Sequence, residues 1–242
     1  MNLIIDIGNT RIKAALFNSY GPVEDKVYTN VGDILADTAF IAQAKRAIIG
    51  TVVSETESFY KSLNAIIPTT VFNSQTKIPL NNLYQSASTL GSDRLAASVG
   101  AYNLYPNANV LVIDAGTCIK YNFTNTQNEY LGGAISPGIQ MKFKALHHFT
   151  SKLPLVETDF SYNDLIGTNT QNSLLSGVLN GSVAEIDGMI DQYKQQFADT
   201  ICVLTGGDSE YLAKRLKNSI FAHQNLVLKG LNDILNYNLE HT

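Results

Sequence analysis

A repeated strand-turn-strand pattern constrains this chain more than any other feature of its sequence. The first copy runs from an apolar stretch, residues 3–5, through Asp6 and a polar turn to a second apolar stretch, residues 12–17. The second copy passes through Asp114, 108 positions later, with one residue fewer in the turn. Because this spacing is close to half of the 242 residues, the pattern predicts two similar domains, each with a hairpin and an aspartate.

The chemistry of the first copy lies in its turn. Asp6 ends a buried run, where an ionised carboxylate is costly unless a cation or hydrogen-bond donors face it, so a metal partner is expected. Gly8 allows close approach of the backbone to a ligand, and Asn9 and Thr10 can direct donors toward an anion. The turn therefore favours phosphate binding. The alternative is an ordinary hairpin in which Asp and Asn only form the turn.

Length and composition limit the class of protein. We expect two domains, residues 1–107 and 108–242. A net charge of −4 with scattered basic residues argues against a nucleic-acid surface. Cys118 and Cys202 lie in apolar runs without zinc or disulfide spacing, which suits a reducing compartment. No apolar run approaches the ~18 residues of a membrane span and no charged-then-apolar leader is seen, so we expect a cytoplasmic protein without membrane contact.

The apolar pattern of the first half predicts alternating strands and helices. Three antiparallel strands are expected at residues 2–6, 11–17 and 23–29. A helix at 33–44, a strand at 47–53, a helix around 59–67 and a strand at 69–72 follow. Residues 73–91 form a long polar loop that contains Tyr84, and loops of this length are usually functional or disordered.

The segment after this loop predicts a helix that begins with a carboxylate. Ser92 is a good N-cap, and Leu95, Val99 and Tyr102 follow at helical spacing. Asp93 therefore lies in the first helical turn. One interpretation is that the acid only complements the helix dipole, and the other is that it takes part in chemistry.

The second half repeats the hairpin and continues with glycine-rich junctions. A strand at 129–135 runs through paired glycines into a helix that ends near residue 149. A long helix at 171–197 carries an apolar stripe from Leu174 to Ile186, which is expected to be core or a dimer face. A strand at 201–205 leads into Gly206 and Gly207, where an adenine ring could lie against backbone, and residues 226–239 form an amphipathic helix.

Six short motifs together carry a family resemblance. They are Asp6-Ile7-Gly8-Asn9-Thr10 with Lys13, Gly91-Ser92-Asp93-Arg94, Asp114-Ala115-Gly116-Thr117, Gly132-Gly133-Ala134-Ile135-Ser136-Pro137-Gly138, Gly167-Thr168-Asn169-Thr170 and Gly206-Gly207-Asp208. In this order the chain resembles the type III pantothenate kinases, a branch of the actin-like ATPase and sugar-kinase superfamily, over almost its full length. It departs from the family pattern at Cys118 and Lys120, where Ala and Thr are usual, and lacks a proline after Tyr84.

The resemblance implies an α/β fold of two ribonuclease-H-like domains, mixed sheets flanked by helices, facing across an ATP cleft. It implies phosphate transfer from ATP to the primary hydroxyl of pantothenate, the first step of coenzyme A synthesis. The implied cofactors are Mg²⁺ with the ATP and a monovalent cation, K⁺ or NH₄⁺. Phosphoryl transfer needs mainly positioning and charge neutralisation, and two opposed hairpins can supply these in a chain without a Walker loop.

The resemblance also assigns roles to residues. Asp93 is the expected general base, Asp114 the ligand of the monovalent cation, and Asp6 the carboxylate that faces the magnesium-bound phosphates. The expected ATP-binding residues are Asp6, Ile7, Gly8, Asn9, Thr10, Arg11, Ile12, Lys13 and Thr117. The expected pantothenate-binding residues are Tyr84, Gly91, Ser92, Asp93, Arg94 and Thr170. A homodimer is expected, with the apolar stripe as its interface and the acceptor site completed across it.

Two other functions remain open at this point. Another small-molecule kinase or a plain ATPase of the same superfamily would share the fold, because a fold does not determine a substrate. A regulatory binding protein on the same fold would have lost catalysis, which the presence of Asp93 and the acidic net charge argue against.

Overall fold

The computed structural model describes residues 1–52 and 56–241. The chain forms two compact units, each described here by itself. Unit 1 comprises Met1–Ala108, Thr124–Gly132 and Asn225–Thr242, and unit 2 comprises Asn109–Phe123 and Gly133–Gln224. The expected boundary at 107/108 lies close to the first crossing between the units. Residues 225–242, expected in the second domain, belong instead to unit 1.

A five-stranded mixed sheet forms the centre of unit 1. Its order is β3-β2-β1-β4-β5, with β1 (Asn2–Ile7), β2 (Ile12–Asn18) and β3 (Gly21–Tyr28) as the antiparallel meander that the sequence predicts. The next two strands, β4 (Arg46–Thr51) and β5 (Thr69–Val71), pair in parallel, β4 with β1 and β5 with β4. This order places the first hairpin beside the crossover strand β4.

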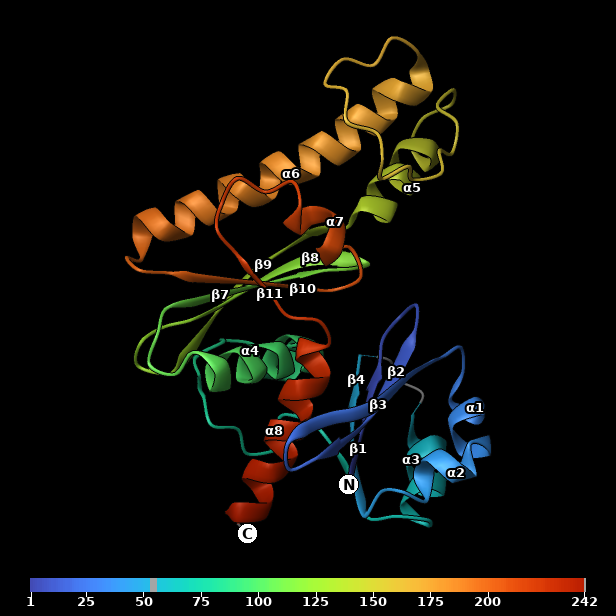
Figure 1. Ribbon diagram of the computed structural model, residues 1–242, viewed down its shortest axis with the longest axis vertical. Helices are drawn as coiled ribbons and strands as arrows, with labels where there is room; N and C mark the ends of the chain where they lie inside the picture. Colours follow the sequence, from blue (N-terminus) through green and yellow to red (C-terminus); the bar gives the residue numbers. More distant parts are fainter. Residues whose placement is uncertain (53–55, 242) are drawn as a thin grey trace. The chain divides into compact units, whose positions relative to one another are not determined.

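Helices cover both faces of this sheet because β1 is apolar on both sides. Leu3, Ile5 and Ile7 face a core shared with α1 (Val31–Ala36), α2 (Thr38–Ile41) and α3 (Glu57–Asn64). Ile4 faces the other core, shared with α4 (Ser92–Leu104) and α8 (Leu226–Glu240), and Figure 1 shows these two helices side by side. The C-terminal helix joins unit 1 because its apolar side chains complete this second core.

The contact between α4 and α8 is unusually close and depends on two glycines. A Cβ built on Gly230 would lie 1.7 Å from the Ala96 carbonyl oxygen, and one on Gly100 would lie 2.7 Å from the Leu226 carbonyl oxygen. Side chains at these positions would push the helices apart, so glycine is needed for backbones to touch.

The second sheet has six strands in the order β11-β10-β7-β8-β9-β6. The hairpin strands are β7 (Val110–Ala115) and β8 (Cys118–Thr124), and β10 (Ile201–Thr205) pairs with β7 in parallel. At one edge, β9 (Glu129–Pro137) pairs with the short β6 (Asn81–Asn82), and at the other β10 pairs with the short β11 (Phe221–Ala222). The strands at 81–82 and 221–222 were not expected from the sequence.

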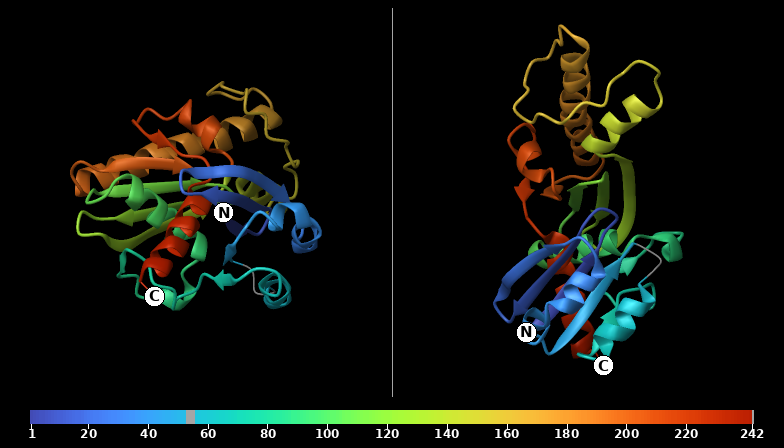
Figure 2. Two further views of the ribbon diagram at one scale, coloured as in Figure 1. Left: turned by 60° about the horizontal axis from the view of Figure 1, so that its bottom comes forward. Right: turned by 90° about the vertical axis from the view of Figure 1, so that its right-hand side faces the viewer.

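The core of unit 2 lies between its sheet and the helices α5 (Ile139–His148), α6 (Thr170–Gln196) and α7 (Ser209–Ala213). Figure 2 shows α6 extending beyond the strands. Leu174, Leu175, Val178, Leu179 and Ile186 are all buried in this core. The expectation that this stripe provides a dimer face is therefore wrong, because the stripe packs on the sheet of its own unit.

Most other expected elements are confirmed. The helix expected at 33–44 is two short helices, because Asp37 caps the second by accepting a hydrogen bond from the Phe40 N–H at 3.2 Å. The strand expected at 47–53 ends at Thr51, and Val53 lies outside the described residues. The loop at 73–91 holds only β6 and a single turn at Ala87–Thr89. Within the described chain, no helix has the length and apolarity to cross a membrane.

The close helix contact gives a stability prediction. Gly→Ala in an exposed helix normally stabilises by about 0.4–1 kcal/mol, but Gly230→Ala should destabilise by about 1–3 kcal/mol, because the methyl group overlaps the Ala96 backbone. Urea unfolding measures the difference. The matched control is Gly177→Ala in α6, where the methyl group meets no atom within 4 Å. A Gly230→Ala protein as stable as Gly177→Ala would contradict the account of α4 and α8.

Candidate functional site

The first hairpin presents an exposed turn at the end of a buried strand. The Gly8 N–H donates to the Arg11 carbonyl oxygen at 3.2 Å, which closes the turn, and Asn9, Thr10 and Arg11 are exposed. Ile7 and Ile12 flank the turn and are buried, so they can offer a ligand only their backbone. The predicted hairpin is confirmed as a structure.

Asp6 and Lys13 occupy opposite positions of this hairpin. They are direct partners in the pairing of β1 with β2, which places both side chains on one face of the sheet. The Lys13 Nζ donates to the Asn225 Oδ1 at 3.3 Å. Asn225 precedes α8 in a left-handed conformation, with φ of 56°. The C-terminal segment thus contributes a polar group next to the hairpin.

Strand β4 connects the hairpin with the start of α4. The parallel register sets Asp6 level with Gly50 and Ile7 level with Thr51. The Ser92 Oγ donates to the Thr51 carbonyl oxygen at 2.9 Å. Since parallel strands end at the same edge of a sheet, this bond brings the first turn of α4 to the edge where the hairpin turn lies.

The first turn of α4 holds Asp93 at its amino end. The Asp93 Oδ1 accepts from the Arg94 N–H at 2.9 Å, and its carboxyl group is half-buried. A Cβ on Gly91 would lie 2.5 Å from the Asp93 Oδ1, so glycine leaves the room that this carboxylate occupies. The dipole of α4 favours negative charge here.

The side chain of Tyr84, in the long loop of residues 73–91, packs against Arg94 of α4. Its ring lies 5.4 Å from the guanidinium carbon of Arg94, a cation-π contact, and Arg94 is 5% exposed. A Cβ on Gly132 would lie 2.9 Å from the Tyr84 ring. Unit 1 thus brings together Tyr84, Arg94 and the rest of the expected acceptor motif.

The second hairpin holds an ion pair that is mostly shielded from solvent. Asp114 is 9% exposed, on β7 level with Thr205 of β10. The Lys120 Nζ lies 2.7 Å from the Asp114 Oδ2. Thr117, at the tip of the turn, is exposed.

Two glycine segments pack against the backbone of the second hairpin. A Cβ on Gly138 would lie 2.1 Å from the Gly116 carbonyl oxygen, and one on Gly206, whose φ is 98°, would lie 2.2 Å from the Ala115 carbonyl oxygen. These glycines serve contacts within the unit. Gly116 and Gly207 instead have nothing within 4 Å of a Cβ. The expectation that an adenine ring lies against the backbone at residues 206 and 207 stays a prediction.

Thr170 lies apart from the other expected residues of unit 2. It begins α6 after Asn169, whose side chain accepts from the Asn172 N–H, and Thr170 itself is exposed. Figure 1 shows that α6 begins beyond the strands of its sheet, next to the loop that follows α5. Within unit 2, the structure does not bring Thr170 to Asp114 and Thr117.

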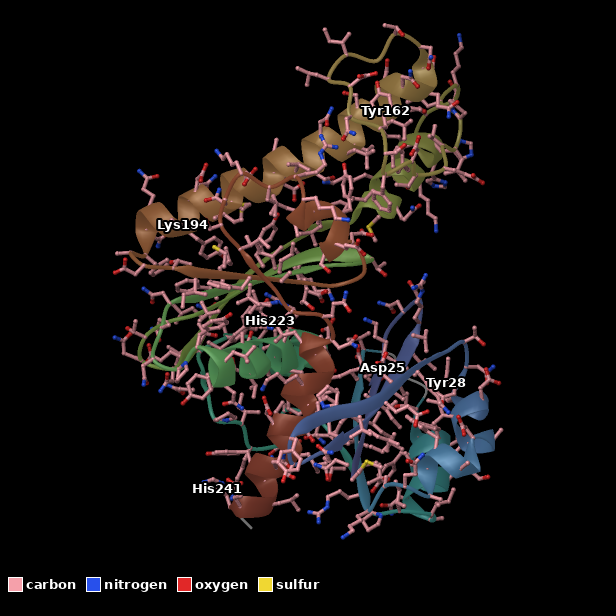
Figure 3. All side chains as sticks on the ribbon, viewed as in Figure 1. Asp25, Tyr28, Tyr162, Lys194, His223 and His241 are labelled. Atoms are coloured by element: carbon pink, nitrogen blue, oxygen red, sulfur yellow. The ribbon has the colours of Figure 1, made fainter. Side chains whose placement is uncertain are left out.

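A groove of about 520 Å³ in unit 2 contains none of the expected site residues. It is lined by α6 and the segment after α7, including Asn180, Asp187 and Arg215. The Arg215 Nη2 donates to the Asn180 Oδ1 at 2.6 Å, and Asp187 accepts from the N–H groups of Lys217 and Asn218 at 3.1 Å. Arg215 also donates to the carbonyl oxygen of Tyr162, labelled in Figure 3 in the loop before α6. These polar groups already bind one another, which favours a structural role.

No group of three or more His, Cys, Asp or Glu side chains in residues 1–52 and 56–241 could hold a metal ion. In general, proteins bind Mg²⁺ with nucleotides through one or two carboxylates plus the phosphates. Asp6, at the end of β1 beside an open turn, fits such a role. Sequence reasoning missed Thr51, Asn225 and the partner of Lys120. The Lys120–Asp114 pair could have been predicted, because each hairpin carries a lysine on its second strand opposite the aspartate.

Comparison with known proteins agrees with these features. Residues 2–192 match the family described as type III pantothenate kinase. A curated relative, the type III pantothenate kinase of Flavobacterium johnsoniae, is 41% identical over 248 residues, which cover 100% of both chains.

Solved structures share the fold. A conserved putative Baf family transcriptional activator from Campylobacter jejuni has a TM-score of 0.65 at 22% identity, covering 98% of this chain and 99% of that one. A ROK hexokinase from Thermus thermophilus has a TM-score of 0.55 at 14% identity, covering 99% of both chains. They bear out the expected α/β fold with two sheets flanked by helices. By its match over residues 2–192 and its 41% identity to a full-length relative, the chain belongs to the type III pantothenate kinase family.

Proposed function

We propose that this protein transfers the γ-phosphoryl group of ATP to the primary hydroxyl of pantothenate. Beside the family membership, one observation carries the proposal: the hairpin turn of residues 8–11 and the first turn of α4 lie at the same edge of one sheet. The register of β1 with β4 and the hydrogen bond from Ser92 to Thr51 hold them there. A turn that can hold phosphates and a carboxylate that can accept the hydroxyl proton are two of the parts that phosphoryl transfer to an alcohol uses.

The hairpin residues have distinct tasks in this proposal. Gly8 permits close approach of the phosphates, while Asn9, Thr10 and Arg11 offer polar groups from an exposed turn. Lys13 adds positive charge on the face that Asp6 shares. Mg²⁺ bound with ATP would neutralise phosphate charge and orient the γ-phosphoryl group. Thr117 on the second hairpin offers a further hydroxyl.

Asp93 is the proposed general base. Its carboxylate accepts the proton of the pantothenate hydroxyl as the oxygen forms a bond to the γ-phosphorus and the bond to the ADP oxygen breaks. Arg94 and Tyr84, packed together, hold the loop against α4 and shape the acceptor side with Gly91 and Ser92. Thr170 is proposed as an acceptor contact on the strength of the motif alone.

Other expectations from the family remain proposals. A cytoplasmic location is among them. A monovalent cation at Asp114 is another expectation from the family, and such an ion would have to compete with the Lys120 ammonium for the carboxylate. The alternatives are another small-molecule kinase or ATPase, and a catalytically silent regulatory protein. ADP release measured with a panel of pantothenate-like alcohols separates them. Turnover only with pantothenate supports the proposal, and ATP hydrolysis without an acceptor, or no turnover at all, would overturn it.

The role of Asp93 is testable by a single substitution. Asp93→Asn should keep ATP binding, measured by calorimetry, and lower turnover about 10²-fold or more, because general-base catalysis is usually worth roughly 10²–10⁴. Asp33→Asn is the matched control: Asp33 also lies in a first helical turn, that of α1, and its turnover should be unchanged. If the turnover of Asp93→Asn is close to that of the unmodified protein, Asp93 is not the general base. Its role would then be limited to its interaction with the helix dipole.

We also propose a homodimer, formed by a surface other than the buried stripe of α6. The segment 149–166 carries five exposed large apolar side chains, and Leu165 and Ile166 are 78% and 77% exposed. They directly precede the Gly167-Thr168-Asn169-Thr170 motif. A cluster of exposed apolar side chains of this kind is typical of an interaction surface.

Replacing Leu165 and Ile166 by Glu should give folded monomers with weaker use of pantothenate, since charges do not tolerate burial in an interface. Light scattering with circular dichroism measures mass and fold. Val27→Glu, on an exposed position of β3, should stay dimeric. Replacing Leu175 and Leu179 by Glu should instead unfold the protein, because both side chains are core. A fully active monomer would refute the dimer.

A further inference from the structure

In the second hairpin, the carboxylate of Asp114 is already paired with a positively charged side chain, that of Lys120. The Lys120 Nζ lies 2.7 Å from the Asp114 Oδ2, and the two side chains are only 21% and 12% exposed. A charge-assisted hydrogen bond in so little water is stronger than the same pair on an open surface. Any ion that binds Asp114 must compete with this ammonium group.

The strands of the hairpin bring the two side chains of this pair to one face of the sheet. The Gly116 N–H donates to the Cys118 carbonyl oxygen at 3.0 Å. Continuing this antiparallel register two residues along each strand sets Asp114 opposite Lys120, on the same face of the sheet. The first hairpin has the same relation between Asp6 and Lys13, but there the lysine donates to Asn225. Of the two hairpins, the second is the one in which the lysine forms an ion pair with the aspartate opposite it.

A free monovalent cation does not fit beside Asp114 in this arrangement. Such an ion would have to share the Asp114 carboxylate with the Lys120 ammonium, which carries the same charge. Otherwise it would displace the ammonium and leave it in a half-buried position without a carboxylate to pair with. The ion expected from the family is K⁺ or NH₄⁺, and the lysine head group is itself a compact ammonium with three donors. Lys120 also stands at a position where the family usually has Thr, which carries no charge.

We propose that the Lys120 ammonium takes the place of the exchangeable monovalent cation at Asp114, so that phosphoryl transfer by this protein needs no added K⁺ or NH₄⁺. The inference rests on the proposed pantothenate kinase activity. A tethered cation is always present at the hairpin, whereas a free ion must bind from solution. The chain would therefore carry within its sequence the charge that other members take from the medium.

The first experiment compares the unmodified protein in different salts at constant ionic strength and Mg²⁺. ADP release with pantothenate should be the same in K⁺, Na⁺ and tetramethylammonium chloride, the last being too large for a carboxylate site. The melting temperature should also be the same in the three salts. If no salt supports pantothenate-dependent ADP release, the proposed function fails. If ADP release occurs but requires K⁺ or NH₄⁺, only the inference about Lys120 fails.

The second experiment removes the internal cation. Lys120→Thr should lose activity in Na⁺ and tetramethylammonium by roughly 10²-fold, a usual cost of removing one charge-stabilising group, and should regain it with K⁺ or NH₄⁺. K⁺ should also raise the melting temperature of this variant above its value in Na⁺. Lys142→Thr is the matched control, because it breaks another half-buried lysine-carboxylate pair of unit 2, with Glu185 at 2.7 Å. Its activity and melting temperature should not depend on the cation.

A folded Lys120→Thr protein that responds equally to all three salts, whether active or inactive, would overturn the inference. So would a cation response of the Lys142→Thr control equal to that of Lys120→Thr, because the effect would then belong to stability in general. If Lys120→Thr does not fold, as judged by circular dichroism, the salt comparison on the unmodified protein decides alone.

Discussion

The parallel pairing of β1 with β4 is the constraint on which the candidate site of unit 1 depends. It brings the ends of two buried strands to one edge, with Ile7 level with Thr51. The Thr51 carbonyl oxygen then receives the Ser92 hydroxyl, and this places the amino end of α4 beside the hairpin turn. A turn that can approach phosphates and the positive end of a helix dipole thus meet through the strand register and one side-chain hydrogen bond, that of Ser92. The sheet defines the edge, and the Ser92 hydroxyl attaches α4 to it.

The two hairpins show how one pattern can be used in two ways. Both set a lysine opposite an aspartate, but Lys13 reaches Asn225 and Lys120 reaches Asp114. Asn225 comes from the segment that leads into α8, far away in the sequence. Lys13 thus takes its partner from a distant segment of its unit, whereas Lys120 takes the aspartate of its own hairpin. Internal repetition predicts the positions of charged groups more securely than their partners.

The elements that short-range patterns define were predicted from the sequence. The hairpins around Asp6 and Asp114, α4 after Gly91 and the long α6 follow from alternation and helical spacing within a few residues. The expectation that Ser92 caps α4 is wrong, because Gly91 is the N-cap and the Ser92 hydroxyl donates to Thr51 instead. Contacts between distant segments were not predictable in this way. The stripe of α6 could not be recognised as core without knowing which sheet lies beneath it, and α8 shows no local sign that it joins the first unit. The monovalent cation at Asp114 is an expectation from the family resemblance, and the contact of Asp114 with Lys120 was not expected.

The same distinction between local patterns and contacts of distant segments applies to the residues of the candidate site. Tyr84 was noticed as an unusual residue in a polar loop, and the structure packs it on Arg94. Gly206 was interpreted as an opening for a ligand, yet its positive φ and its closeness to the Ala115 carbonyl oxygen serve the packing of unit 2. Gly207, its neighbour, is the residue with open space. A glycine in a motif therefore does not tell whether the chain or a ligand needs the room.

The return of the chain to unit 1 at its C-terminus has a consequence for biosynthesis. Leu228, Leu231, Ile234 and Leu235 of α8 complete a core whose other side chains come from earlier parts of the sequence, such as Ile4, Ala15 and Val99. During translation, which proceeds at about 5–20 residues per second, the first unit stays unfinished until the last helix leaves the ribosome. All residues of the second unit emerge before that moment. The strands of unit 1 and α4 are thus translated well before the helix that completes their core.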